Sequence, residues 1–141
     1  MPGTMPPETI LIVDDDPICL AIASLALQTA GFATRTAADG MEALDLLNLE
    51  QPALILSDIQ MPHMDGFELA RRTRQIPRFR DIPMVALTAF DAADTEQRAR
   101  DAGFTAYMKK PVHAASLANR LRRLLTTSRD REGALPSRHG S

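Results

Sequence analysis

The sequence predicts an α/β fold in which a parallel sheet of five strands carries helices on both faces. Short strand-like runs alternate with helix-like segments from residue 9 to residue 126, and three of the five runs are apolar throughout. Strands that alternate with helices form parallel sheets with helices packed on their faces. The chain of 141 residues, 45% hydrophobic and 24% charged, has the size and composition of one ordinary globular domain.

The strand-like runs are of two kinds. Residues 9–13, 53–57 and 82–88 read TILIV, ALILS and IPMVALT, and such apolar runs are typical of strands covered on both faces. Residues 32–36 and 105–109, FATRT and TAYMK, mix polar and apolar side chains and suit the edges of a sheet. An order of 2-1-3-4-5 places the mixed runs at the edges, and this is the flavodoxin-like doubly wound arrangement.

The helix-like segments have recognisable starts. We expect helices at residues 17–31, 40–50, 67–75, 92–103 and 113–126. Asp16 precedes Pro17 as an N-cap precedes a proline in the first helical position. Asp39 and Asp65 are each followed three residues later by glutamate, which resembles a capping box with aspartate as the cap.

The two ends of the chain differ from this body. Residues 1–8 are rich in proline, glycine and threonine, and residues 127–141 are polar and aperiodic, so we expect a flexible leader and a disordered tail around a domain at 9–126. A single cysteine, Cys19, excludes an internal disulfide and suits the reducing cytoplasm. No apolar run is long enough for a membrane span, and a net charge of −2 gives no reason to expect direct DNA binding.

Polar residues follow the predicted strands at the sheet edge where ligands bind. Asp14 and Asp15 follow the first strand, Asp58 follows the third, Thr88 ends the fourth, and either Lys109 or Lys110 supplies a lysine at the end of the fifth. In an open α/β sheet, ligands bind outside the carboxyl ends of the strands where the strand order reverses. Carboxylates that converge there repel one another, and Mg²⁺ with its oxygen ligands relieves that repulsion.

A carboxylate beside a divalent cation, a hydroxyl and an ammonium group is suited to phosphoryl transfer onto aspartate. Aspartate is a known covalent nucleophile. The metal and the lysine neutralise charge on the transferred group, and little else is required of the protein. The sequence therefore indicates that Asp58 is held ionised as a nucleophile.

Four motifs in order carry a family resemblance. They are ILIVDDDP (10–17), LILSDIQMPHMDG (54–66), MVALTA (84–89) and YMKKP (107–111). With them the chain, over roughly residues 8–126, resembles a response-regulator receiver domain of two-component phosphorelay signalling. The resemblance implies that Asp58 is the phosphoacceptor and that Mg²⁺ is held by Asp14, Asp15, Asp58 and the backbone carbonyl of Gln60.

The resemblance implies further roles at the same edge. Thr88 and Lys110 assist the transfer, and the Lys110–Pro111 peptide is cis. Thr88 and Tyr107 form a switch that changes the surface of the fourth helix, fifth strand and fifth helix. Gln60 and Phe90 tune the lifetime of the phosphoryl group, and we assign Asp65 and Gly66 to a turn and a helix cap.

The resulting hypothesis is a signalling module and not an enzyme with a diffusible substrate. Its partners are a sensor histidine kinase or a histidine phosphotransfer protein, and an unknown downstream protein. The chain is either a stand-alone regulator or a receiver fragment of a hybrid kinase. A phosphohydrolase of the haloacid-dehalogenase type would want an acid where Gln60 stands, a phosphorylation-independent interaction domain would lack site residues, and the P-loop signature is absent.

Overall fold

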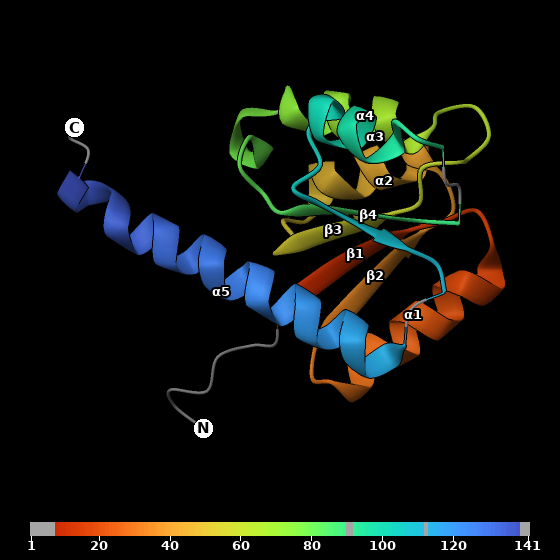
Figure 1. Ribbon diagram of the computed structural model, residues 1–141, viewed down its shortest axis with the longest axis horizontal. Coiled ribbons are helices and arrows are strands. Elements are labelled where there is room, and N and C mark those ends of the chain that lie inside the picture. Colours follow the sequence, from red (N-terminus) through yellow and green to blue (C-terminus); the bar gives the residue numbers. More distant parts are fainter. Residues whose placement is uncertain (1–7, 90–91, 112, 139–141) are drawn as a thin grey trace.

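The computed structural model describes residues 8–89, 92–111 and 113–138, with side chains described as far as residue 127. Its strands are β1 (Thr9–Val13), β2 (Ala33–Ala37), β3 (Leu54–Ser57), β4 (Met84–Thr88) and β5 (Ala106–Lys109). They form one sheet in the order β2-β1-β3-β4-β5, and every pair is parallel (Figure 1). The predicted fold class and strand order are confirmed.

The helices cover the two faces of this sheet unequally. They are α1 (Pro17–Thr29), α2 (Gly40–Leu49), α3 (Gly66–Arg74), α4 (Thr95–Ala102) and α5 (Ala114–Arg138). Figure 1 shows α2, α3 and α4 above the sheet and α1 with α5 below it. A short 3-10 helix, η1 (Pro77–Phe79), precedes β4 and was not predicted from the sequence.

Alternation along the central strands divides the core into two layers. In β1, Leu11 and Val13 pack on the side of α2, α3 and α4, whereas Ile10 and Ile12 pack on the side of α1 and α5. Successive side chains of a strand point to opposite faces, so an apolar run supplies both layers at once. This explains why β1, β3 and β4 read as continuous apolar segments in the sequence.

Aspartate caps fix the starts of the first three helices. The side chains of Asp16, Asp39 and Asp65 each accept a hydrogen bond from a backbone N–H of the first turn. The following glutamates do not close the predicted capping boxes. Glu42 accepts from the N–H one residue before the cap, and Glu68 pairs with arginines of its own helix.

The C-terminal helix is longer than expected. We predicted its end near residue 126, but the backbone is helical through residue 138. Residues 127–138 contain Gly133 and Pro136, which are poor helix formers, and have no apolar stripe, so nothing in the sequence explains this extension. Figure 1 shows this part of α5 running clear of the sheet.

The structure describes only part of the predicted leader and tail, and it can be searched for a membrane-spanning helix. Residues 1–7 of the expected leader and residues 139–141 lie outside the described residues. The carbonyl of Glu8, the first described residue, accepts a hydrogen bond from the N–H of Ala33. Over the part of the chain that the structure describes, no helix is both long and apolar enough to cross a bilayer.

Candidate functional site

Three carboxylates meet at the carboxyl edge of the sheet. Asp14 and Asp15 follow β1, Asp58 follows β3, and one ligand oxygen from each lies within 4.8 Å of the others. The register causes this, because Val13 pairs with Ser57 and the N–H of Asp58 donates to the carbonyl of Val13 at 2.9 Å. The predicted convergence of these acids is therefore present in the structure.

The carboxylate of Asp14 is buried and fully engaged. Its residue is only 5% exposed. One oxygen accepts from the backbone N–H of Asp16 at 2.9 Å, and the other accepts from Lys110 Nζ at 2.6 Å. A buried charge is tolerated when it is paired and hydrogen-bonded, and Asp14 meets both conditions.

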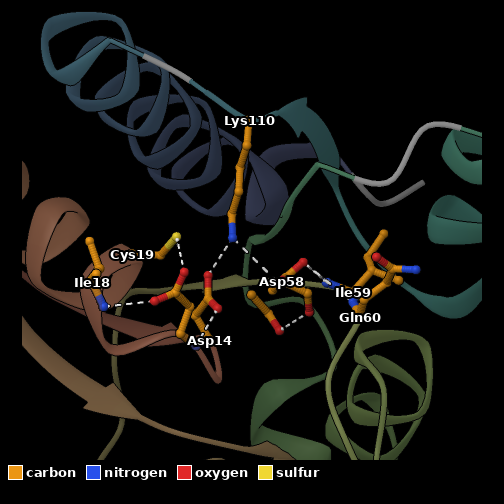
Figure 2. A network of polar contacts seen from close by, with 9 residues as sticks. Asp14, Ile18, Cys19, Asp58, Ile59, Gln60 and Lys110 are labelled. Atoms are coloured by element: carbon orange, nitrogen blue, oxygen red, sulfur yellow. Dashed lines mark hydrogen bonds and ion pairs between the residues drawn. The ribbon is translucent and has the colours of Figure 1, made fainter.

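The carboxylate of Asp58 is held from two sides. Its Oδ1 accepts from the N–H of Ile59 at 2.7 Å and, more weakly, from the N–H of Gln60 at 3.4 Å. Its Oδ2 faces Lys110 Nζ at 3.4 Å (Figure 2). These contacts give the Asp58 carboxylate polar partners at the end of an apolar strand, which offsets the cost of its burial.

Lys110 is the cation between these acids. Its backbone N–H donates to the carbonyl of Thr88 at 2.9 Å, and its peptide bond to Pro111 is cis, as expected. Figure 2 shows the side chain reaching down between Asp14 and Asp58. Burial alone lowers the pKa of Lys110, but the hydrogen bond to Asp14 and the charges of Asp58 and Asp14 outweigh it and raise the pKa above its usual value.

The other predicted residues lie at or near the same edge. Thr88 is buried at the end of β4, next to Lys110. Tyr107 pairs in register with Ala86 and is partly buried against the layer formed by α2, α3 and α4. Gln60 is exposed in the loop after β3, whereas Phe90 lies outside the described residues.

Asp16 and Cys19 belong to the start of α1. Asp16 caps the helix, and its second oxygen accepts a hydrogen bond from Cys19 Sγ at 3.3 Å. Burial first, and then this bond, raise the pKa of the Cys19 thiol. Their contacts account for both residues as local structure.

From the sequence, Gly66 was predicted to lie in a turn and a helix cap. The structure shows that it also allows a close approach between two segments. A Cβ on Gly66 would lie 2.8 Å from the Cα of Ile59 and against the carbonyl oxygen of Asp58. Its N–H also donates to the carbonyl of Ile59 at 2.7 Å. Glycine is needed here because α3 starts directly against the backbone of the acidic loop, and the Asp-Gly pair in MPHMDG was the available signal.

The family follows from a comparison with protein-family models. The model described as "Response regulator receiver domain" matches residues 10–122. The chain belongs to this family. A receiver domain is a phosphoacceptor in two-component signalling, and the class works with histidine kinases.

Known relatives and solved structures agree with this assignment. The polar-differentiation response regulator DivK of Brucella anthropi is 35% identical over 106 residues, which cover 75% of this chain and 86% of that protein. The sensor histidine kinase RcsC of Escherichia coli is 38% identical over 103 residues, which cover 73% of this chain but 11% of the kinase. The structure of chemotaxis protein CheY4 of Vibrio cholerae aligns with a TM-score of 0.80 and 32% identity, covering 83% of this chain and 98% of that one.

Proposed function

We propose that Asp58 accepts a phosphoryl group from a phosphohistidine of a sensor kinase or a histidine phosphotransfer protein. The observation that carries the proposal is the cluster itself: three carboxylates lie within 4.8 Å of one another, and a lysine ammonium lies 3.4 Å from Asp58 Oδ2. Asp14 is already held by Lys110 at 2.6 Å and by the N–H of Asp16, whereas Asp58 Oδ2 has only the longer contact to Lys110 among the contacts described, and the family pattern places the acceptor at Asp58. This arrangement suits an ionised nucleophile that receives a highly charged group.

The donor set of the acidic cluster fits Mg²⁺. The cluster offers only oxygen ligands, and Mg²⁺ takes one or two carboxylates together with waters and phosphate oxygens. We propose Asp14, Asp15, Asp58 and the carbonyl of Gln60 as the residues that would hold it. Bound there, the metal would supply positive charge to the phosphoryl oxygens.

Each group of the site has its own role in the phosphoryl transfer. The Asp58 carboxylate attacks phosphorus, a new O–P bond forms, and the P–N bond to the donor imidazole breaks with its electron pair leaving on nitrogen. The Lys110 ammonium stabilises charge on the phosphoryl oxygens, and the Thr88 hydroxyl donates a hydrogen bond to one of them. The backbone N–H of Ile59 fixes the attacking carboxylate through its other oxygen.

The output is a change of surface. Phosphorylation adds nearly two negative charges beside Thr88. We infer that Thr88 moves toward them and Tyr107 turns inward, which alters the face formed by α4, β5 and α5 for an unidentified downstream protein. Gln60 and Phe90 tune how long the phosphoryl group persists. The domain assists its own phosphorylation and dephosphorylation but turns over no diffusible metabolite.

A surface beside the site suits a protein donor. Ile18, Ile22 and Leu25 are 68%, 64% and 66% exposed on α1. Ile22 also lines an apolar groove of about 200 Å³ between α1 and α5 that reaches Lys110. An exposed apolar patch next to a reacting group favours contact with another protein over a small polar metabolite.

The single cysteine suits a reducing compartment, and we propose a cytoplasmic location.

A receiver within a hybrid kinase is the second candidate. The match to RcsC favours this candidate, because it shows a similar segment that makes up 11% of a much longer sensor histidine kinase. The phosphoryl chemistry at Asp58 is the same in both cases. A phosphohydrolase is less favoured because Gln60 stands where such an enzyme wants an acid.

Mass spectrometry after incubation with acetyl phosphate and Mg²⁺ tests the proposal. The wild-type protein gains about 80 Da, the mass of one phosphoryl group, and Asp58→Asn gains nothing. An adduct of equal yield on Asp58→Asn, or none on the wild type with magnesium present, contradicts it. Continued hydrolysis of simple phosphate esters by the wild type favours the phosphohydrolase instead.

A further inference from the structure

Helix α4 has little apolar anchoring in the core. Its buried residues are Thr95, Ala99 and Ala102, so none is larger than threonine. Among the described residues, each of the other four helices buries at least one leucine. Because burial free energy scales with the apolar area removed from water, the inner face of α4 contributes little to holding it.

The two ends of α4 are held by polar contacts. Asp94 precedes the helix without a side-chain capping bond, unlike the aspartate caps of α1, α2 and α3. The buried Thr95 instead donates its N–H to the Ala92 carbonyl at 3.1 Å and accepts the N–H of Ala92 at Oγ1 at 3.0 Å. At the far end the Arg74 guanidinium of α3 donates two hydrogen bonds to the Gly103 carbonyl at 2.9 and 2.7 Å.

One side chain in the middle of α4 contacts an aromatic ring of α3. The Arg98 guanidinium lies over the ring of Phe67 at 4.5 Å from the centroid. Among the described residues Arg98 has no carboxylate partner, whereas Arg100 on the same helix pairs with Glu96 at 3.0 Å. A cation over an aromatic face is attracted by the ring quadrupole, so this contact holds α4 against α3.

Phe67 connects this contact to the acidic loop. It is 5% exposed and follows Gly66, whose N–H donates to the carbonyl of Ile59. Arg98 and Phe67 also line the open groove that contains Asp15 and Gln60. The position of α4 is therefore fixed relative to the loop that carries Asp58.

We propose that the Arg98–Phe67 contact holds α4 in its resting position and so limits phosphorylation of Asp58. Arg98 is a positioning residue that acts through Phe67, and the inference rests on the function proposed above. β4 ends at Thr88 and α4 begins at Thr95, so the switch proposed for Thr88 lies close in the chain to the start of α4. A contact that favours one position of α4 lowers the fraction of protein with α4 in another position.

Removal of the contact should make the protein more readily phosphorylated. We compare the wild type with Arg98→Ala, Arg98→Lys and Phe67→Leu, using the initial rate of phosphorylation by acetyl phosphate and the concentration of beryllium fluoride that half-saturates the site. Arg98→Ala and Phe67→Leu should react about two- to fivefold faster and bind beryllium fluoride more tightly by the same factor. Arg98→Lys keeps a cation and should fall between them and the wild type.

Arg100→Ala is the matched control, because it removes the same charge from the same helix without touching Phe67. Hydrogen exchange of α4 in the unphosphorylated protein gives a readout that does not depend on the chemistry at Asp58. Faster exchange in Arg98→Ala but not in Arg100→Ala supports the proposal. Equal effects of the two variants, or no effect of Arg98→Ala on exchange and rate, overturn it, whereas a wild type that takes up no phosphoryl group overturns the proposed function instead.

Discussion

At the scale of single residues, Lys110 balances the charge of the acidic edge. Its ammonium lies 2.6 Å from Asp14 and 3.4 Å from Asp58, and the side chain is 19% exposed. Asp14 is buried, so removing the lysine leaves a desolvated carboxylate with one hydrogen bond from the backbone. The cost of such an unpaired buried group determines what a substitution does.

Lys110→Met should destabilise the protein by about 1–3 kcal/mol at pH 8 without magnesium. The folded-state pKa of Lys110 lies above its unfolded value of 10.5. A group whose pKa is higher in the folded protein than in the unfolded protein stabilises the fold. This contribution is complete at pH values below the unfolded-state pKa and is lost as the pH rises through the folded-state pKa. Above pH 10.5 the wild type therefore loses the stability that Lys110 contributes, whereas Lys110→Met has no such contribution to lose. The difference in unfolding free energy between the two proteins becomes smaller. Urea unfolding at pH 8 and pH 11 checks this, and a difference independent of pH would rule out the lysine as its source.

His63 stores backbone strain next to the site. Its φ is 70°, and the N–H of Met64 donates to the carbonyl of Pro62 at 2.7 Å across it, which closes a three-residue γ-turn. Strained φ values of non-glycine residues cost about 1–3 kcal/mol and occur often at functional loops.

His63→Gly should raise the free energy of unfolding by about 0.5–1 kcal/mol, because relief of the strain exceeds the entropy that glycine loses on folding. His113→Gly is the control, since His113 is also an exposed histidine outside regular structure but has no positive φ. Urea unfolding of both variants is the measurement. A loss of stability in His63→Gly, or an equal gain in His113→Gly, would show that strain at residue 63 is not the cause.

The aspartates of the site could be predicted individually, but the contacts that hold them could not. A carboxylate at the end of an apolar run requires a partner, and this indicated Asp58 and the acid pair of β1 from the sequence alone. The close approach of Gly66 to the Asp58 backbone, and the φ of His63, depend on how the loop folds back. Only coordinates contain that information.

At the scale of elements, Arg74 joins three segments. From the end of α3 its guanidinium donates to the carbonyls of Gly103, Phe79 and Arg80, which fixes η1 and the end of α4. The Arg74 side chain is partly buried, and burial lowers its pKa. In the sequence Arg74 is one of three arginines at a helix end, and nothing there distinguishes it from its neighbours.

Arg74→Met should cost about 1–3 kcal/mol of stability, because it leaves partly buried carbonyls without donors. Arg71→Met on the same helix is the matched control. The Arg71 side chain is 56% exposed and, among the side chains that the structure describes, pairs with Glu68 alone, so its loss should cost less than about 0.5 kcal/mol. Equal losses of unfolding free energy in urea would mean that Arg74 acts as an ordinary surface charge.

Element boundaries were predictable where a local signal existed. Aspartate caps marked the starts of α1, α2 and α3, and the structure begins each helix directly after its cap. The end of α5 has no such signal: the helix continues to Arg138 through Gly133 and Pro136, residues that usually end a helix. The 3-10 turn of η1 follows a proline and was too short to show any periodicity.

At the scale of the whole molecule, the strand order decides where the acids meet. β1 and β3 are neighbours in the sheet although two helices and an edge strand separate them in the chain. Their carboxyl ends lie side by side at the switch point, so Asp14, Asp15 and Asp58 converge there whatever their loops contain. This is why topology inferred from apolar patterns was enough to predict the cluster, while the roles of Thr88, Tyr107 and Gln60 rest on the family.

Magnesium binding tests the central claim most directly, because the account requires that the clustered carboxylates hold a cation beside Asp58. Calorimetric titration with MgCl₂ should show one saturable site in the wild type and in Asp16→Asn, which removes a neighbouring charge from a helix cap outside the cluster. Asp15→Asn should bind at least about tenfold more weakly. No saturable binding by the wild type, or equal binding by Asp15→Asn, would contradict the account.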